Sequence, residues 1–278
     1  MMNNSEIKKN PSLAHSEVLK KICSPLVNLG IHFFGYTAID INGNAFCLGS
    51  KPDYAAEYLR HNHARNDVHC RFDKAPKKYH YDFWDYLKID RPTEELYRMA
   101  AAFDQGHTLT ISQHAEEITH CFHFSGHMTD IGINQRYIEK MDSLHAFILY
   151  FKKCLQSIPE IAAVYQYPVQ IVSNKKIHKK KVVAVSLDPK SVALINTLKD
   201  TIYFRNQFHY FLTENELECL KWLKLGKSAV MIAKIHNVSY KTIERYIEAC
   251  KQKYQCYTLF QLGEKTSTAG LAPFLELL

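Results

Sequence analysis

The chain has 278 residues, and 46% of them are hydrophobic. This apolar content can build a sizeable core and excludes a largely disordered protein. Its apolar runs are shorter than the roughly 18 residues that a membrane span needs, and its first residues lack the pattern of a signal peptide. The eight cysteines include no C-x-x-C pair, so we expect reduced thiols, a cytoplasmic location and no contact with a membrane.

The net charge of +7 is unevenly distributed. Counting Lys and Arg against Asp and Glu gives −1 for residues 1–170, +6 for 171–211 and +2 for 212–278. Most of the middle value comes from five lysines, which are Lys175, Lys176, Lys179, Lys180 and Lys181. Two interpretations stay open, because a solvated loop has this composition and so does a segment that neutralises phosphates beside a DNA-binding module.

The front part of the chain alternates between helical and strand patterns. We expect the polar residues 1–12 to be loose and the first helix to end at Gly30, while Asn42-Gly43 is a strong signal for a hairpin turn. The predicted elements are a helix over 15–29, strands over 31–40 and 45–50, helices over 52–63 and 92–103, strands over 107–112 and 117–124, and a long amphipathic helix over 134–156. This order predicts an α+β domain in which an antiparallel sheet lies between helical layers, an α-β-α sandwich.

Two segments of this front part have a recognisable combination of residues. GIHFFGYTAID at 30–40 is followed by KPDYAAEY at 51–58 and then by an Asn-Asp pair. This combination resembles the autoinducer-binding domain of quorum-sensing LuxR proteins. That domain carries a Trp, a Tyr four residues later and an Asp nine residues after the Tyr, and this chain has Tyr54, Tyr58 and Asp67 at those intervals.

The resemblance implies a pocket for a small-molecule signal, either an acyl-homoserine lactone or another amide-bearing compound. Tyr54 and Tyr58 are about one helical turn apart, so their side chains project from the same face. Asp67 would accept a hydrogen bond from an amide N–H, the two phenols would donate to carbonyl oxygens, and Trp84 would form an apolar wall. Tyr54 replaces the family's Trp and Val68 replaces a Pro, so the ligand of this chain can differ from that of its relatives.

Several alternatives to a signal pocket remain open. The tyrosines can be ordinary core residues and Asp67 a turn residue, in which case the front domain only dimerises or binds a partner protein. A sheet flanked by helices can also hold flavin or haem, as in PAS-like sensors. We do not expect an enzyme, because no G-x-S-x-G elbow, phosphate-binding glycine loop or H-E-x-x-H motif occurs.

The 15 histidines do not follow a zinc pattern. The dense patches are His61, His63 and His69, and His114, His120, His123 and His127. In a strand His123 lies on the opposite face from His120, and no Cys–His set has the spacing of a zinc site. We therefore interpret the histidines as a solvated face and expect neither a metal nor another cofactor.

Residues 166–211 form a predicted connecting segment. VQIVS at 169–173 and VVAVS at 182–186 flank the lysines and predict a small hairpin. A helix is predicted to start at Asp188-Pro189 and to end near Ile202. Apart from its charge, this segment gives no functional signal.

Residues 212–247 have the pattern of a helix-turn-helix. Thr213 and Glu216 form a capping box for the first helix. Gly226 is expected to end that helix in the left-handed conformation, and Ser228 to cap the second helix. Ser239 or Tyr240 opens the third helix. The residues expected to face inward on the first two helices are Leu217, Leu220, Leu223, Ile232, Ala233 and Ile235.

The motifs LT-x-x-E, G-K-S, I-A and V-S-x-K-T-I lie along this segment. From Leu212 to about Leu262 the chain resembles the all-α DNA-binding domain of the LuxR family of bacterial transcription regulators. The resemblance implies sequence-specific binding to double-stranded DNA, and helix geometry places the third helix in the major groove.

Helix geometry also assigns expected roles at the DNA. The residues expected to contact phosphates are Lys227, Ser228, Ser239, Lys241, Thr242, Lys251 and Lys253. Glu244, Arg245 and Glu248 lie on the expected exposed face, where a Glu can accept from cytosine N4. For Glu248 an intrahelical pair with Arg245 or Lys251 is an equal alternative.

A homodimer is expected because one short helix reads only a half-site. The candidate interfaces are residues 258–262 and the apolar stripe of the helix at 134–155, although core packing is the preferred interpretation of that stripe. The predicted domains are a sensor domain at 1–165, a basic linker at 166–211 and the DNA-binding domain at 212–278. Together they predict a transcriptional regulator controlled by a small molecule.

Overall fold

The computed structural model describes residues 3–70, 79–87, 89–115, 117–171 and 211–278. Contacts between Cα atoms divide the chain into two compact units. The first unit holds Met1–Gln135 and Cys154–Ser186, and the second holds Arg136–Lys153 and Leu187–Leu278. None of the helices in the described part of the chain has the length and hydropathy that a membrane span requires. The domain boundaries near 165 and 211 remain a prediction.

The N-terminal residues are helical, so the prediction of a loose start was wrong. A capping box between Asn3 and Glu6 begins α1 (Asn4–Lys9), and Asn10 caps α2 (Pro11–Ala14). Asn10 is fully buried, and its amide donates a hydrogen bond to the backbone oxygen of Cys47, 3.2 Å away. Polar side chains in this segment therefore cap helices and bind a strand, which a simple polarity count does not reveal.

The helix predicted over 15–29 exists in two parts. It consists of α3 (Ser16–Cys23) and the 3-10 helix η1 (Ser24–Leu29). The change comes at Pro25, which has no N–H to donate to an α-helical ladder. Gly30 then ends the segment with a left-handed φ of 76°, as predicted.

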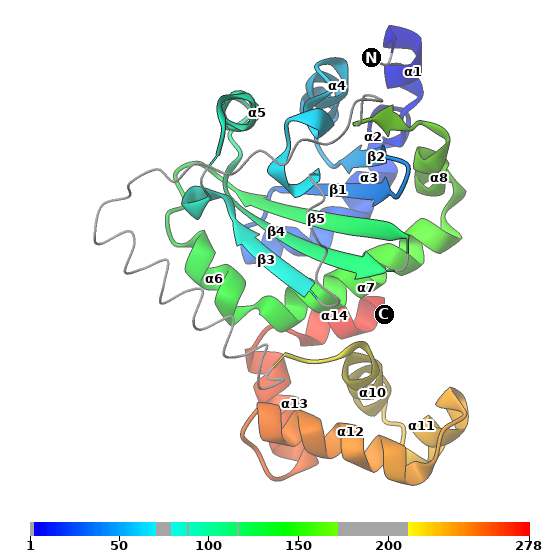
Figure 1. The fold of residues 1–278 in the computed structure, drawn as a ribbon. Coiled ribbons are helices and arrows are strands. Elements are labelled where there is room, and N and C mark those ends of the chain that lie inside the picture. Colours follow the sequence, from blue (N-terminus) through cyan, green and yellow to red (C-terminus); the bar gives the residue numbers. More distant parts are fainter. Residues whose placement is uncertain (1–2, 71–78, 88, 116, 172–210) are drawn as a thin grey trace. The chain divides into compact units, whose positions relative to one another are not determined.

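The first unit is built on one six-stranded antiparallel sheet with the order β3-β4-β5-β1-β2-β6 (Figure 1). Its strands are β1 (Phe33–Asp40), β2 (Asn44–Gly49), β3 (Tyr79–Phe83), β4 (Gly106–Ala115), β5 (Ile118–Gly126) and β6 (Val169–Gln170). Gly43 has a φ of 76° in the β1–β2 turn, which confirms the Asn-Gly hairpin. The edge strand β3 was missed, because only its last residue is buried and no apolar alternation marks it.

Helical segments of the first unit contact both faces of the sheet. The ring of Phe33 on β1 packs edge-on against Tyr54 of α4 (Pro52–Arg60), with ring centroids 5.0 Å apart. On the opposite face, the hydroxyls of Tyr36 and Tyr165 lie 2.9 Å apart, and Tyr165 belongs to η5 (Ala163–Gln166). The predicted antiparallel sheet with helical layers is therefore confirmed.

Short segments connect these elements. They are η2 (His63–Arg65), η3 (Val68–Cys70), η4 (Trp84–Tyr86), α5 (Arg91–Ala102), α6 (Ile133–Glu139) and α8 (Pro159–Ala162). The helix predicted over 134–156 is interrupted at Lys140, where α6 ends and α7 (Met141–Ser157) begins. The predicted hairpin partner at 182–186, the helix from Asp188 and the five lysines lie outside the described residues.

The second unit is helical. It contains most of α7 together with α10 (Glu214–Lys224), α11 (Ala229–His236), α12 (Tyr240–Lys253), α13 (Leu259–Thr268) and α14 (Ala272–Leu277) (Figure 1). Met141, Leu144, Ile148 and Phe151 of α7 have no exposed surface, so this stripe is core. The Asp142 carboxylate accepts hydrogen bonds from the Leu212 N–H at 3.1 Å and the Tyr254 hydroxyl at 2.9 Å.

Candidate ligand pocket and DNA-binding surface

A cavity lies between α4 and the sheet in the first unit, with about 470 Å³ of empty space that includes its opening to solvent. Its lining includes all four residues that the sequence assigned to a ligand, which are Tyr54, Tyr58, Asp67 and Trp84. The rings of Tyr54 and Tyr58 lie 6.1 Å apart on one face of α4, as their spacing predicted. The structure therefore brings the four residues together around one cavity.

One row of aligned residues crosses the sheet, and three of its members, Gly49, Gly35 and His123, line the cavity. The aligned positions are Gly49 on β2, Gly35 on β1, His123 on β5, Thr110 on β4 and Asp82 on β3. A Cβ at Gly35 would lie 3.1 Å from the ring of Phe33, and one at Gly49 would lie 3.3 Å from the methyl group of Ala55. The two glycines therefore allow neighbouring side chains to approach the sheet closely.

Asp67 is the buried carboxylate of the cavity, with 1% of its surface exposed. It accepts a hydrogen bond from the hydroxyl of Tyr58 at 3.3 Å and one from the backbone N–H of His69 at 2.9 Å. Tyr54 has no hydrogen bond to this carboxylate, and burial raises the pKa of its phenol. Of the two tyrosines, only Tyr58 therefore forms a hydrogen bond with the Asp67 carboxylate.

Trp84 has both a stacking partner and a hydrogen-bond partner. Its indole stacks on the ring of Tyr97, with centroids 4.3 Å apart and planes 7° apart. Its Nε1–H donates to the hydroxyl oxygen of Thr110 at 2.7 Å, and this hydroxyl also lies 2.8 Å from Nδ1 of His123. A chain of polar groups thus runs from the indole to a histidine in the cavity.

The interpretation of the histidines as a solvated face was wrong for His145, which is 3% exposed, and for three histidines beside the cavity. His63, His69 and His123 are buried, because they pack against aromatic side chains around the cavity. His69 and His80 both contact the carboxylate of Asp82, at 3.2 and 3.0 Å. Burial raises the pKa of Asp82, but these two contacts outweigh it and hold that pKa well below its usual value.

His123 was not assigned to the cavity from the sequence. It lies on the opposite face of β5 from His120, as predicted, since His120 bonds to Tyr36 on the other side of the sheet. Burial lowers the pKa of His123 to about 4, with Asp67 opposing that shift and His69 adding to it. The signal that could have revealed it is the position of a histidine between Phe122 and Phe124 in a strand.

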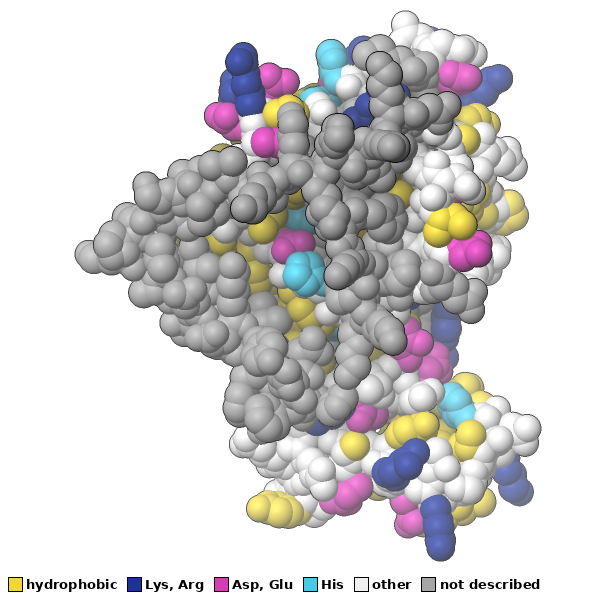
Figure 2. All heavy atoms as spheres, viewed as in Figure 1, with side chains coloured by type: hydrophobic (Ala, Val, Ile, Leu, Met, Phe, Trp, Pro, Cys, Tyr) yellow, Lys and Arg dark blue, Asp and Glu magenta, His cyan; other side chains and the backbone are white. Residues whose placement is uncertain are grey.

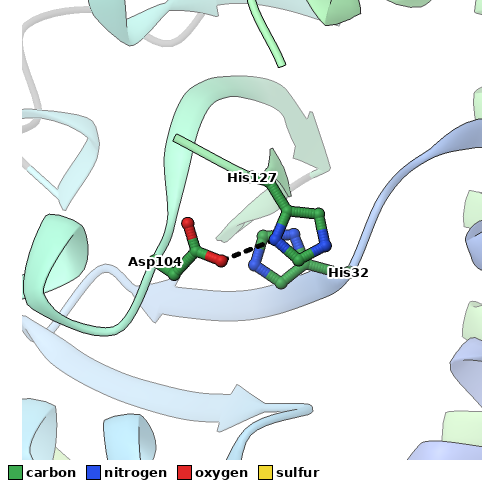
Figure 3. A group of neighbouring side chains, drawn as sticks. All are labelled: His32, Asp104 and His127. Atoms are coloured by element: carbon green, nitrogen blue, oxygen red, sulfur yellow. Dashed lines mark hydrogen bonds and ion pairs between the residues drawn. The ribbon is translucent and has the colours of Figure 1, made fainter. Parts of the chain in front are cut away.

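A second histidine group lies away from the cavity (Figure 3). Nδ1 of His127 is 2.6 Å from Asp104, whose other oxygen accepts the N–H of Met128. The rings of His32 and His127 are stacked 3.8 Å apart with planes only 1° apart, and the possible ligand atoms of the three side chains lie within 4.8 Å. Nitrogen lone pairs in parallel stacked rings do not point toward one ion. The hydrogen bonds of Asp104 instead connect the turn before β4 to the residues that follow β5.

The second unit contains three helices with the geometry of a helix-turn-helix. The Thr213 hydroxyl and the Glu216 carboxylate form the predicted capping box of α10. Gly226 ends that helix with a φ of 74°, and Ser228 and Ser239 cap α11 and α12. Leu217, Leu220, Ile232 and Ala233 are buried as predicted. Leu223 is only partly buried, and Ile235 is 47% exposed, so its predicted inward position was wrong.

Residues 211–262 match the family model described as bacterial regulatory proteins, luxR family. This segment is a luxR-family DNA-binding domain. Among solved structures, the crystal structure of Escherichia coli SdiA in space group P6522 has 11% identity and a TM-score of 0.33, and covers 92% of this chain and 91% of that chain. SdiA in complex with octanoyl-rac-glycerol has 12% identity and a TM-score of 0.32, with 93% and 87% covered. The comparison with curated proteins gave no match.

The luxR-type domain exposes most of the residues that were assigned to DNA. Ser228, Ser239, Lys241, Glu244, Arg245 and Glu248 are exposed, while Lys227, Thr242 and Lys251 are partly buried. Lys and Arg side chains project from this part of the chain with apolar groups between them (Figure 2). Val230, Met231 and Tyr240 are apolar residues with about half of their surface exposed.

Several of the expected DNA contacts have partners inside the protein. The ammonium group of Lys253 lies 2.6 Å from the buried carboxylate of Glu216, so its predicted contact with DNA phosphate was wrong. Glu248 pairs with Lys251 at 2.6 Å, which is the intrahelical alternative. Glu244 raises the pKa of Tyr240 through a hydrogen bond, and Arg245 lies 5.8 Å from the ring of Tyr246.

Proposed function

We propose that this luxR-type regulator is controlled by an uncharged small molecule bound in the cavity between α4 and the sheet. The supporting observation is the carboxylate of Asp67, which is buried against a mainly apolar lining. The described residues give this carboxylate two donors, which leave acceptor positions on its oxygens unused, since an ionised carboxylate can accept about four hydrogen bonds. An amide N–H or a hydroxyl of a ligand would supply the missing donor.

The surrounding groups define the rest of the binding mode. Tyr58 would stay on the Asp67 carboxylate, while the hydroxyl of Tyr54 would donate to a carbonyl oxygen of the ligand. The indole of Trp84 would cover an apolar part of the ligand, because its N–H is already used by Thr110. The proposed ligand is therefore an amide-bearing or hydroxyl-bearing molecule with an apolar chain, of which an acyl-homoserine lactone is one example.

Binding is tested by calorimetry with a panel of acyl-homoserine lactones and with octanoyl-rac-glycerol, the compound bound to SdiA in the complex above. We expect saturable binding of at least one compound and a loss of about tenfold or more in Asp67→Asn, because that change turns an acceptor oxygen into a donor. Glu94→Gln on the exposed face of α5 is the matched control and should bind normally. Equal binding by Asp67→Asn would contradict the proposal.

At the DNA we propose that α12 lies in the major groove, where Glu244 and Arg245 face base edges. Glu248 shares this face but is held by Lys251. The proposed phosphate contacts are Lys227, Ser228, Ser239, Lys241, Thr242 and Lys251. The N-terminal ends of α11 and α12 support this assignment, since their capping residues Ser228 and Ser239 lie where backbone N–H groups favour an anion.

We also propose that the protein acts as a homodimer through α13. Tyr257 and Phe260 are 88% and 82% exposed, which is unusual for two neighbouring aromatic side chains. Tyr257 directly precedes Thr258, the cap of α13, and Phe260 lies within the interface predicted at 258–262. A second copy of the same helix would cover both rings and place two α12 helices for two half-sites.

A further inference from the structure

His123 lines the cavity, and its buried ring nitrogen Nε2 has no hydrogen-bond partner among the described residues. The residue itself is 6% exposed and pairs with Gly35, which also lines the cavity. Buried polar groups in folded proteins nearly always have partners, so an unpaired one beside a cavity requires an explanation.

The neighbouring hydrogen bonds decide which nitrogen of His123 carries the proton. The hydroxyl of Thr110 accepts the indole N–H of Trp84 at 2.7 Å, and it lies 2.8 Å from Nδ1 of His123. No other acceptor for this hydroxyl occurs among the described residues. Its single proton is therefore donated to Nδ1, because an N–H at that position would leave the Thr110 proton without an acceptor.

A neutral imidazole that accepts at Nδ1 must carry its proton on Nε2. His123 is neutral at pH 7, since burial lowers its pKa to about 4. The chain Trp84–Thr110–His123 thus fixes an N–H donor at the end of the ring. The carboxylate of Asp67, in contrast, offers only acceptors to the same cavity.

We propose that His123 is a ligand-binding residue whose Nε2–H donates to an acceptor oxygen of the ligand, and that Trp84 and Thr110 are positioning residues that fix this tautomer. The ligand then needs two features, an N–H or O–H for Asp67 and a separate carbonyl, hydroxyl or ether oxygen for His123. This inference rests on the proposed function and narrows its ligand class. An alkane lacks both groups and an ionised fatty acid lacks the donor, so both are excluded.

The tautomer is tested without any ligand, by nitrogen NMR of the full-length protein labelled with ¹⁵N-histidine. We expect the His123 signals of a neutral ring with the proton on Nε2, unchanged between pH 8 and pH 6. In Thr110→Val, which keeps the shape of the side chain and removes the hydroxyl, the preference for that tautomer should be lost. A proton on Nδ1 or a charged ring at pH 7 in the wild type would overturn the inference.

The ligand contact is tested by comparing His123→Gln with His123→Phe. Gln retains an N–H donor at a similar distance from the backbone, whereas Phe retains only the ring. With N-octanoyl-homoserine lactone and octanoyl-rac-glycerol as probes, we expect Phe to weaken binding about tenfold and Gln to restore most of it. Equal binding by Phe and the wild type would overturn the role of His123 while leaving ligand control intact. Failure of the wild type to bind a full panel would instead overturn the proposed function, and this inference with it.

Discussion

The carboxylate of Glu216 lies 2.6 Å from the ammonium group of Lys253, and the two side chains are only 6% and 10% exposed. Glu216 also accepts the backbone N–H of Thr213 as part of the capping box. The same residue therefore begins α10 and connects it to the end of α12. Lys253 in addition donates to the backbone oxygen of Phe211 at 2.8 Å, so it joins three segments of the domain.

Removing Lys253 should destabilise the domain because the charge of Glu216 would stay buried without its partner. For Lys253→Met we expect the free energy of unfolding to fall by about 3 kcal/mol, as measured by urea denaturation. Lys251→Met is the matched control, since its partner Glu248 is 58% exposed. That control should lose less than about 1 kcal/mol. Similar losses for the two variants would show that the buried pair stabilises the domain no more than the exposed pair does.

The pH dependence of stability should carry a contribution from His123. Its pKa is about 4 in the folded protein and 6.5 for an ordinary histidine, so below pH 6.5 the unfolded chain binds a proton that the folded chain does not. The free energy of unfolding should therefore fall as the pH decreases from 6.5 to 4, by about 1.4 kcal/mol for each pH unit. His123→Gln should flatten the profile over this window, whereas parallel profiles would contradict the assignment.

The sequence predicted the helix-turn-helix well because each of its signals is local. Thr213 with Glu216, Gly226 and Ser228 define helix ends within a few residues of themselves. The partner of Glu216 was not predictable in this way, since Lys253 lies at the far end of α12. Its position among basic residues suggested phosphate binding, and only the packing of α12 against α10 shows the buried pair.

In the candidate pocket, too, the residues marked by local signals were predicted and those that depend on long-range pairing were missed. The spacing of Tyr54 and Tyr58 predicted their common face, and resemblance added Asp67 and Trp84. His123 was missed because its role depends on the register of β4 with β5, which places Thr110 opposite it. Strand pairing of this kind is a long-range property that no single segment encodes. The edge strand β3, which completes the row with Asp82, was missed for a related reason.

Substitutions of Glu244 and Lys241 on α12 should have different effects on DNA binding. Glu244→Ala is expected to relax the preference at one base pair of the operator by about 1–3 kcal/mol. Lys241→Ala should weaken binding to all sequences alike and lower the salt dependence, because a phosphate contact carries no sequence information. Selection from random DNA followed by titration of the preferred sites measures both effects. An unchanged site preference in Glu244→Ala would exclude it as a base reader.

Assembly should depend on the exposed rings of α13. Phe260→Glu is expected to weaken the dimer at least tenfold, because a charge would have to be buried against the second copy. Sedimentation velocity over a range of concentrations gives the monomer–dimer equilibrium. Leu225→Glu, at an apolar residue that is 56% exposed after α10, is the control and should leave the dimer intact. Equal dissociation constants for the wild type and Phe260→Glu would place the interface elsewhere.

Ligand control is tested most directly by the affinity of the full-length protein for its operator, measured by fluorescence anisotropy with and without a compound that binds the cavity. We predict that the ligand changes the dissociation constant by at least about fivefold, and that Asp67→Asn abolishes this change while retaining basal DNA binding. An operator affinity that stays the same at saturating ligand would contradict ligand control. The luxR-type domain would then bind DNA constitutively, and the front unit would serve assembly alone.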